Sequence, residues 1–469
     1  MSPISIYLTR RIAVVVIGAT LALTVSGLTH LRQTPSLKIA QGMLGETWYR
    51  IQLAGQHVGY MYNNAYLDYL GRWHFQTNTH FLLQPEAPNT IAKHLVFDGI
   101  APHAMVSADF TNRDQATHAH TRVARTSSGL VATLSRNTTT GDAIPLDWDY
   151  DLLEFLGFEH WLATQRPVAD EKFTVSSADF ERLRIIPQSY RVVARRPEGY
   201  LVEVNAPLAA TRTQLNHAFR PLWLNMAGVF EVTASNQSEA IALQELRYKT
   251  NYLVPADQRL TNHTSLKSLH LRIVGAPRID LPRNLQLSAN PITSGTEIDQ
   301  YRGEALRYPV TDHAIQKLAQ QALSQSRNEP STGNLGDTDP LLEQLVRLTH
   351  KQLRYSEDDP AGSVLQALEK GRGECTDYAD LLTTVARAAG LPARTIYGLA
   401  YKDGSNPAFM FHAWNEVFAN GEWQALDPTW AQVRVDATHI PLTDIEAARL
   451  MMANNTEGLQ IKILDAQYF

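Results

Sequence analysis

The spacing of apolar residues changes near residue 300 of this 469-residue chain, and that change limits the folds it can adopt. From about residue 45 to 275, apolar and polar residues mostly alternate, as they do in strands with one buried face. After residue 300, apolar residues recur every three or four positions, as they do in amphipathic helices. Because a chain of this length exceeds one compact core, we expect a large antiparallel β-rich domain over 45–300 and an α+β domain over 301–469.

Turn residues divide the alternating region into hairpins. Residues 49–53 alternate before Ala54-Gly55, and residues 73–81 alternate after a turn over 70–72. A helical pattern over 151–163, with Leu152, Leu153, Leu156 and Trp161 on one face, predicts a single helix that covers the sheet. Four histidines have no acidic or histidine neighbour at metal-ligand spacing, and we interpret them as sheet-surface residues: His74, His80, His118 and His120. The alternative is a ligand-binding sheet face, because a curved sheet often forms a groove.

The N-terminus has the pattern of a membrane-targeting segment. Arg10-Arg11 precedes an uncharged run over 12–28, which is near the lower limit for crossing a bilayer as a helix. The positive pair before the run predicts that the bulk of the chain lies on the outer, extracytoplasmic side. We therefore expect residues 1–32 to be a single-pass signal anchor, with a signal peptide cleaved after Val25-Ser26-Gly27 and a buried core helix as the alternatives.

Charge excludes one class of partner. The net charge is −5, the isoelectric point is about 6.3, and no segment carries a stripe of lysine and arginine. Nucleic-acid binding depends on such a stripe, so we do not expect a nucleic-acid partner.

Cys375 is the only cysteine, so it has no partner within the chain for a disulfide and no companions for a cysteine metal site. It opens a segment whose apolar positions from Tyr378 to Ala389 follow helical spacing. A thiol in the first turn of a helix lies near unpaired N–H groups and the positive end of the helix dipole, which favour the thiolate. Cys375 is therefore either a small buried residue or a nucleophile.

A hairpin downstream supplies a base and a carboxylate. Asn420-Gly421 is a strong signal for a two-residue turn, and this turn pairs 419 with 422 and 414 with 427. His412 and Asp427 then lie diagonally on one sheet face, within reach of each other. A thiol, an imidazole and a carboxylate in this arrangement predict a nucleophilic triad of Cys375, His412 and Asp427.

Three motifs in the same order resemble the transglutaminase-like family, and they lie at residues 371–379, 389–394 and 412–429. The resemblance implies a papain/transglutaminase-like α+β core, with the cysteine at a helix N-terminus and the histidine and aspartate on adjacent antiparallel strands. It also implies that Cys375 is the nucleophile, His412 the general base and acid, and Asp427 the orienting carboxylate. The segment 436–440 resembles one that follows the core in bacterial relatives, and we interpret its His439 as structural.

The implied reaction passes through a thioester on Cys375 and acts on protein or peptide amides. An amine acceptor gives crosslinking and water gives deamidation or peptide cleavage, and the sequence leaves these outcomes open. Tyr355 is a candidate second oxyanion donor. We expect neither a cofactor nor a metal. The alternative function is a non-catalytic envelope scaffold that binds its partner through the β domain, with a thiol core that only packs.

Overall fold

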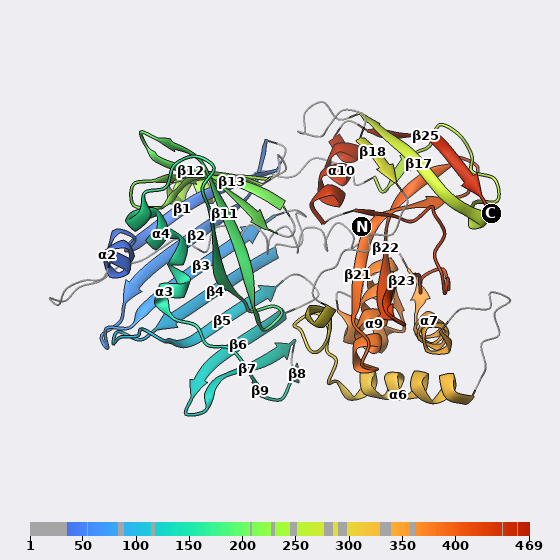
Figure 1. The fold of residues 1–469 in the computed structure, drawn as a ribbon, viewed down its shortest axis with the longest axis horizontal. Helices are drawn as coiled ribbons and strands as arrows, with labels where there is room; N and C mark the ends of the chain where they lie inside the picture. Colours follow the sequence, from blue (N-terminus) through green and yellow to red (C-terminus); the bar gives the residue numbers. More distant parts are fainter. Residues whose placement is uncertain are drawn as a thin grey trace. The chain divides into compact units, whose positions relative to one another are not determined.

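The computed structural model of the chain describes most of its length, in segments separated by short gaps. The described residues are 35–53, 55–82, 89–113, 118–137, 139–206, 209–226, 230–243, 251–275, 285–288, 298–328, 339–356, 363–442, 444–456 and 458–469. They form two compact units, which divide the sequence between Arg247 and Tyr248 (Figure 1). The membrane segment expected over 1–32 lies outside the described residues. Of the helices in the described segments, none is both long and apolar enough to span a bilayer.

The described part of the first unit forms one 15-stranded sheet in which all neighbouring strands are antiparallel. Its order is β10-β11-β12-β13-β14-β15-β1-β2-β3-β4-β5-β6-β7-β8, with β9 paired to β7. The strands are β1 (Gly45–Leu53), β2 (Gln56–Leu67), β3 (Trp73–Phe81), β4 (Asn89–Phe97), β5 (Met105–Arg113), β6 (His118–Thr126), β7 (Gly129–Arg136), β8 (Thr139–Thr140), β9 (Ile144–Pro145), β10 (Lys172–Asp179), β11 (Arg184–Arg196), β12 (Gly199–Ala206), β13 (Ala209–Asn216), β14 (Pro221–Met226) and β15 (Phe230–Ser235). The large antiparallel sheet expected from the alternating pattern is confirmed.

In the part of the first unit that the structure describes, four short helices accompany the sheet: α2 (Pro35–Gly42), α3 (Leu152–Phe155), α4 (Gly157–Gln165) and α5 (Gln237–Ala240). The helix expected over 151–163 is therefore two helices that meet at Leu156. Asp151 caps α3 in a reciprocal capping box with Glu154. Leu152 and Leu156 are buried as expected, whereas Leu153 is 50% exposed because it lies on the outer side of α3.

The boundary between the units lies before the position expected near residue 300. The strands β16 (Leu253–Pro255) and β17 (Leu266–Gly275) pair with β22 (Ala408–Ala419) and β25 (Leu459–Tyr468), which belong to the second unit. The strands within 253–275 alternate as strands should, but β22 and β25 follow more than 130 residues later in the chain (408 − 275 = 133), and only the partner of β17 on its other edge, β18 (Leu285–Ser288), lies nearby. Alternation identifies a strand and not the sheet it joins, which explains the difference.

The second unit is a small mixed layer of sheet and helices. Its largest sheet has the order β16-β22-β21-β24, and β23 also pairs with β22. The other elements are η1 (His263–Ser265), β18 (Leu285–Ser288), η2 (Ile298–Tyr301), α6 (His313–Asn328), α7 (Pro340–Gln352), β19 (Arg354–Tyr355), α8 (Val364–Lys370), β20 (Arg372–Gly373), α9 (Cys375–Ala388), β21 (Ala393–Lys402), β23 (Glu422–Leu426), β24 (Ile440–Leu442) and α10 (Asp444–Thr456).

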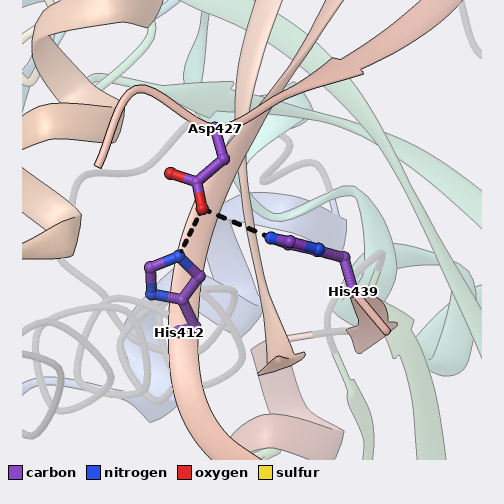
Figure 2. A group of neighbouring side chains, drawn as sticks. All are labelled: His412, Asp427 and His439. Atoms are coloured by element: carbon purple, nitrogen blue, oxygen red, sulfur yellow. Dashed lines mark hydrogen bonds and ion pairs between the residues drawn. The ribbon is translucent and has the colours of Figure 1, made fainter. Parts of the chain in front are cut away.

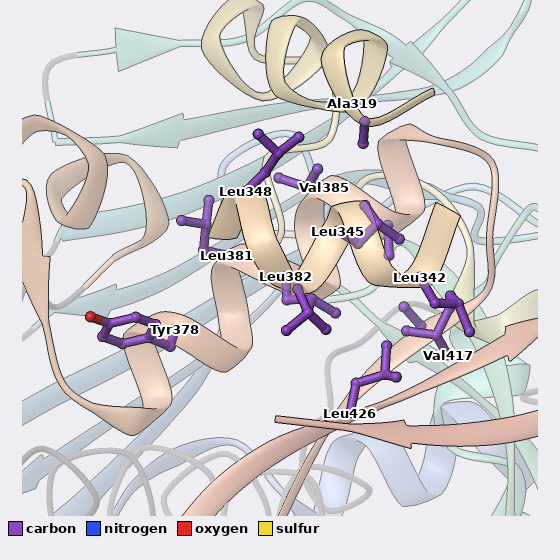
Figure 3. Packing of buried hydrophobic residues seen from close by; sticks show 14 of the residues in the cluster. Ala319, Leu342, Leu345, Leu348, Tyr378, Leu381, Leu382, Val385, Val417 and Leu426 are labelled. Carbon is purple, nitrogen blue, oxygen red and sulfur yellow. The ribbon is translucent and has the colours of Figure 1, made fainter. Parts of the chain in front are cut away.

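The core of the second unit forms around α9. The predicted apolar stripe of this helix is buried, from Tyr378 to Ala386, and it packs against α6, α7 and the β22–β23 hairpin (Figure 3). Leu345 of α7 and Leu426 of β23 are both 0% exposed in the same cluster. Because α9 is held on several sides, its first residue has a fixed position relative to the sheet.

The contact between β21 and β24 leaves no room for a side chain at Gly398. A Cβ atom there would collide with the Ile440 carbonyl oxygen and would lie 2.5 Å from the Trp414 ring. We predict that Gly398→Ala lowers the free energy of unfolding by about 1–3 kcal/mol, because either β24 or Trp414 must move. Gly404→Ala is the matched control, since nothing lies within 4 Å of a Cβ atom there. Chemical denaturation of both variants checks this, and equal stabilities would contradict it.

Candidate active site

Cys375 is the first residue of α9, as the sequence predicts, and Glu374 is the N-cap. The Thr376 N–H donates to Glu374 Oε1 (3.0 Å), and the Glu374 N–H donates to Asp377 Oδ2 (3.0 Å). This reciprocal pair leaves no space at Gly373, where a Cβ atom would lie 2.6 Å from that of Asp377. The glycine before the cysteine is therefore required by the start of the helix itself.

The thiol of Cys375 is buried and donates to a carboxylate. Its residue is 1% exposed, and Sγ lies 3.0 Å from Glu374 Oε2. Burial raises the pKa of the Cys375 thiol well above its ordinary value, the Glu374 carboxylate raises it further, and the backbone N–H of Ala413 lowers it. The sequence predicts the opposite balance, because the dipole of the helix favours a thiolate. That favourable effect is outweighed here by burial and by the negative charge of the N-cap.

The β22–β23 hairpin has the register that the sequence predicts. Ala419 pairs with Glu422 and Asn415 with Leu426, and the chain turns through Asn420 and Gly421 at φ values of 55° and 87°. Both turn residues adopt the left-handed region that the Asn-Gly pair favours. This register brings His412 and Asp427 onto one face.

A buried hydrogen bond joins His412 to Asp427 (Figure 2). His412 Nε2 and Asp427 Oδ2 are 2.8 Å apart, in side chains 1% and 0% exposed. Burial alone would raise the pKa of Asp427, but the two neighbouring histidines hold it well below its usual range. An ionised carboxylate only accepts, so His412 Nε2 donates and Nδ1 of the neutral ring is left as an acceptor.

His439 is a second partner of the same carboxylate oxygen, at 3.3 Å from its Nε2 (Figure 2). Its other ring nitrogen lies 3.7 Å from Asp436 Oδ1. Burial lowers the pKa of His439, but hydrogen bonds and charge from Asp427 and Asp436 raise it above the ordinary value overall. From the sequence we interpret His439 as structural and predict no contact with Asp427. The pairing of β24 with β21 places His439 beside Asp427. The only local signal in the sequence is Asp436, three residues before His439.

Two other contacts fix the site. The buried amide of Asn415 donates across the layer to the Ala379 carbonyl (2.7 Å) and Thr383 Oγ1 (2.8 Å), tying β22 to α9. Trp430 stacks on the His412 ring, with centroids 4.3 Å apart, and is itself 37% exposed. The thiol, the imidazole and the carboxylate are thus held in place and covered from solvent.

The trio His412, Asp427 and His439 could also be read as a metal site, because its ligand atoms lie within 4.8 Å of one another. Two imidazole nitrogens and one carboxylate oxygen form a donor set that zinc accepts. However, the Nε2 atoms of both rings already bond to Asp427 Oδ2. The hydrogen-bonded network accounts for the arrangement without an ion.

Tyr355, the candidate second oxyanion donor, and two tryptophans of the β22–β23 hairpin have other neighbours. The backbone of Tyr355 pairs with Gly373, two residues before the thiol, and Tyr355 is 42% exposed. Trp414 packs edge-on to His439. Trp423 instead packs against Phe418, away from the described network residues.

Two of the four histidines expected on the sheet surface, His74 and His120, have partners on other strands or loops that sequence spacing does not reveal. His74 Nδ1 lies 2.9 Å from His94 Nε2, and His74 Nε2 lies 3.2 Å from Asp68 Oδ2. His120 Nε2 lies 2.9 Å from Asp109 Oδ1. These contacts arise from strand pairing and from the turn before β3, so they were invisible to a search along the sequence.

We predict that Asp427→Ala lowers the free energy of unfolding by about 3–5 kcal/mol at pH 7, because two buried histidines lose their acceptor. The contact lowers the folded-state pKa of Asp427. The contribution of this contact to the free energy of unfolding is therefore fully present above about pH 4, the pKa of an aspartate in the unfolded chain. It is lost as the pH falls through the lower pKa that Asp427 has in the folded protein. Urea denaturation at pH 7 and at a series of pH values below 4 measures this.

The control for this prediction is Asp299→Ala, in a surface pair with Arg302 whose aspartate side chain is 94% exposed. It should change the stability by less than about 1 kcal/mol. A similar small change for Asp427→Ala would contradict the prediction.

Comparison with known proteins supports the motif resemblance. Residues 326–428 match the family model of the transglutaminase-like superfamily, and Cys375, His412 and Asp427 lie inside that match whereas His439 lies beyond it. Over 76 residues the chain is 34% identical to the kyphoscoliosis peptidase of Mus musculus, a match that covers 15% of this chain and 12% of that protein. The chain therefore corresponds to about an eighth of the length of this curated relative.

Two solved structures are more distant. A β-barrel-like protein of a domain of unknown function from Brucella abortus is 11% identical, with 40% of this chain and 94% of that chain covered and a TM-score of 0.28. The periplasmic domain of TgpA from Pseudomonas aeruginosa is 13% identical, with 56% and 82% covered and a TM-score of 0.24.

Proposed function

We propose, from the transglutaminase-like superfamily match over residues 326–428, that the second unit is a cysteine-dependent acyltransferase or amidohydrolase acting on protein or peptide amides. One observation carries the proposal. His412 Nε2 is bonded to a buried, ionised Asp427, so the Nδ1 acceptor of the ring is available for a proton. The next residue, Ala413, directs its backbone N–H to the Cys375 thiol. The backbone next to the proposed base therefore contacts the proposed nucleophile, which supports this assignment of roles.

The reaction follows from these positions. His412 Nδ1 accepts the Cys375 proton, and the thiolate attacks the carbonyl carbon of an amide to form a carbon–sulfur bond. His412 then gives that proton to the departing nitrogen as the carbon–nitrogen bond breaks, leaving a thioester on Cys375. Asp427 stabilises the imidazolium formed between these steps. The Cys375 N–H, in the first turn of α9, is a donor for the developing oxyanion.

The acceptor that resolves the thioester decides the product. An amine gives a new amide and hence a crosslink, whereas water gives a carboxylate through deamidation or peptide cleavage. The name of the partial relative, kyphoscoliosis peptidase, favours cleavage for a domain of this kind. In this proposal the first unit presents or selects the substrate. We also propose an extracytoplasmic location with an N-terminal anchor, on the sequence pattern of residues 1–32.

We predict that a glutamine-containing peptide supplied with a primary amine leaves an acyl group on Cys375, detected by mass spectrometry of the intact protein and its peptides. His412→Ala should reduce the rate of acylation about 10²- to 10⁴-fold, because the thiol loses its base. Cys375→Ala should abolish the adduct. Analysis of the released peptide separates crosslinking, deamidation and cleavage.

The matched control is His313→Ala, which removes an exposed histidine at the start of α6. It should acylate at the wild-type rate. Envelope function that survives Cys375→Ala but is lost on deletion of the first unit would contradict the enzyme and support the non-catalytic scaffold.

A further inference from the structure

Glu374 uses its two carboxylate oxygens for two different tasks. Oε1 accepts the Thr376 N–H and so caps α9, while Oε2 accepts the Cys375 thiol proton at 3.0 Å. The residue is 1% exposed, so no solvent competes for either contact. Short side chains such as serine or aspartate are the usual N-caps. The longer side chain of glutamate caps the helix and also reaches the sulfur.

In the part of the chain that the structure describes, the proposed base is meanwhile free at one ring nitrogen. His412 Nδ1 is buried, and among the residues that the structure describes no hydrogen-bond partner faces it. A buried acceptor without a partner is unusual and indicates a site where something else binds or arrives. The thiol proton, which the proposed reaction delivers to this nitrogen, is instead directed at Glu374.

A cap alone does not explain a glutamate here. Burial raises the pKa of Glu374 to about 7, with a further contribution from the charge of Asp377. A glutamine would cap the helix equally well without placing a second buried negative charge at the helix start. The positive end of the helix dipole offsets part of the cost of this charge, and the contact with the thiol gives the carboxylate a second role.

We propose that Glu374 holds the Cys375 nucleophile in its protonated form and releases it to His412 only when the contact between thiol and carboxylate is broken. This rests on the proposed function of Cys375. In the release step the S–H group turns about the Cα–Cβ bond, from Glu374 Oε2 towards His412 Nδ1, and no covalent bond changes. The proton then passes to Nδ1, which leaves a thiolate, an imidazolium and the capping carboxylate.

Several other ionisable groups lie around this step, and each has a different partner. In α9, Asp377 accepts from the Glu374 N–H and Asp380 pairs with Arg307. Asp427, after β23, has a charge that also disfavours the thiolate, and His439, before β24, is bonded to Asp427. His350 in α7 bonds to the Pro428 carbonyl. Among these described contacts, Glu374 is the only carboxylate that bonds directly to the sulfur.

The test measures the rate of iodoacetamide alkylation of Cys375 against pH in the full-length chain. Glu374→Gln keeps an oxygen for the helix cap and removes the charge, so the midpoint of the profile should fall by about 1 to 3 pH units. Below that midpoint alkylation should be at least about tenfold faster than in the wild type. In the wild type, the profile should also show an inflection near pH 7, where Glu374 titrates.

Asp377→Asn is the matched control, because it removes one negative charge three residues after Glu374, from a side chain that has no described bond to the sulfur. Since Asp377 raises the pKa of Glu374, this variant extends the charged form of Glu374 to lower pH and should not lower the midpoint. If Glu374→Gln fails to fold by circular dichroism, Glu374→Ser replaces it, since serine caps the helix but cannot reach Sγ. An unchanged or raised midpoint in the folded variant, or a wild-type profile without the inflection, would overturn the role of Glu374.

Acylation by the peptide substrate is measured on the same samples. Normal acylation with an unchanged alkylation midpoint would refute the control by Glu374 and leave the proposed reaction standing. A shifted midpoint without any acylation in the wild type would refute the reaction, while the effect of Glu374 on the thiol would remain.

Discussion

The buried contact between His412 and Asp427 is the interaction on which the rest of the second unit depends. A charged carboxylate with 0% exposure is tolerated only when donors surround it. Asp427 has four: the two histidine rings on Oδ2, and the backbone N–H groups of Thr429 (2.7 Å) and Trp430 (3.2 Å) on Oδ1. The hairpin, the loop after β23 and strand β24 each supply part of this set. The local fold is therefore arranged around one negative charge.

The thiol is attached to this arrangement by a different contact. Asn415 lies on the same strand as His412 and donates two hydrogen bonds to α9, the helix that begins at Cys375. Because α9 is rigid, these bonds also fix the position of its first residue, Cys375. The distance between the thiol and the proposed base therefore depends on the buried amide of Asn415 and on the packing of α9. In our proposal the negative charge of Glu374 determines whether the thiol can lose its proton.

The sequence predicts the parts of this site that follow from local rules. The Asn420-Gly421 turn fixes the register of the hairpin, and the apolar stripe after Cys375 fixes the helix, so both were foreseen. The contact of His439 with Asp427 was not predicted, because it depends on the pairing of β24 with β21, whose paired residues Leu399 and Ile440 are 41 positions apart in the sequence (440 − 399 = 41). The boundary near 300 differs from the structure for the same reason, since β17 finds its partner β25 at the far end of the chain. The helix dipole predicts a thiolate, but it gives neither the size of the effect of burial nor the orientation of the Glu374 carboxylate, and these two raise the pKa of the thiol.

The protonation of the two ring nitrogens of His412 tests the central claim most directly. Nitrogen-15 NMR of histidine-labelled protein at neutral pH, with His412→Ala used to assign the signals, reports which ring nitrogen carries the proton. We expect a proton on Nε2, held by Asp427, and a bare Nδ1, because Nδ1 is the atom that accepts the proton of Cys375 in the proposed reaction. A His412 ring with its proton on Nδ1 would contradict it, because such a ring could not act as the base for this thiol.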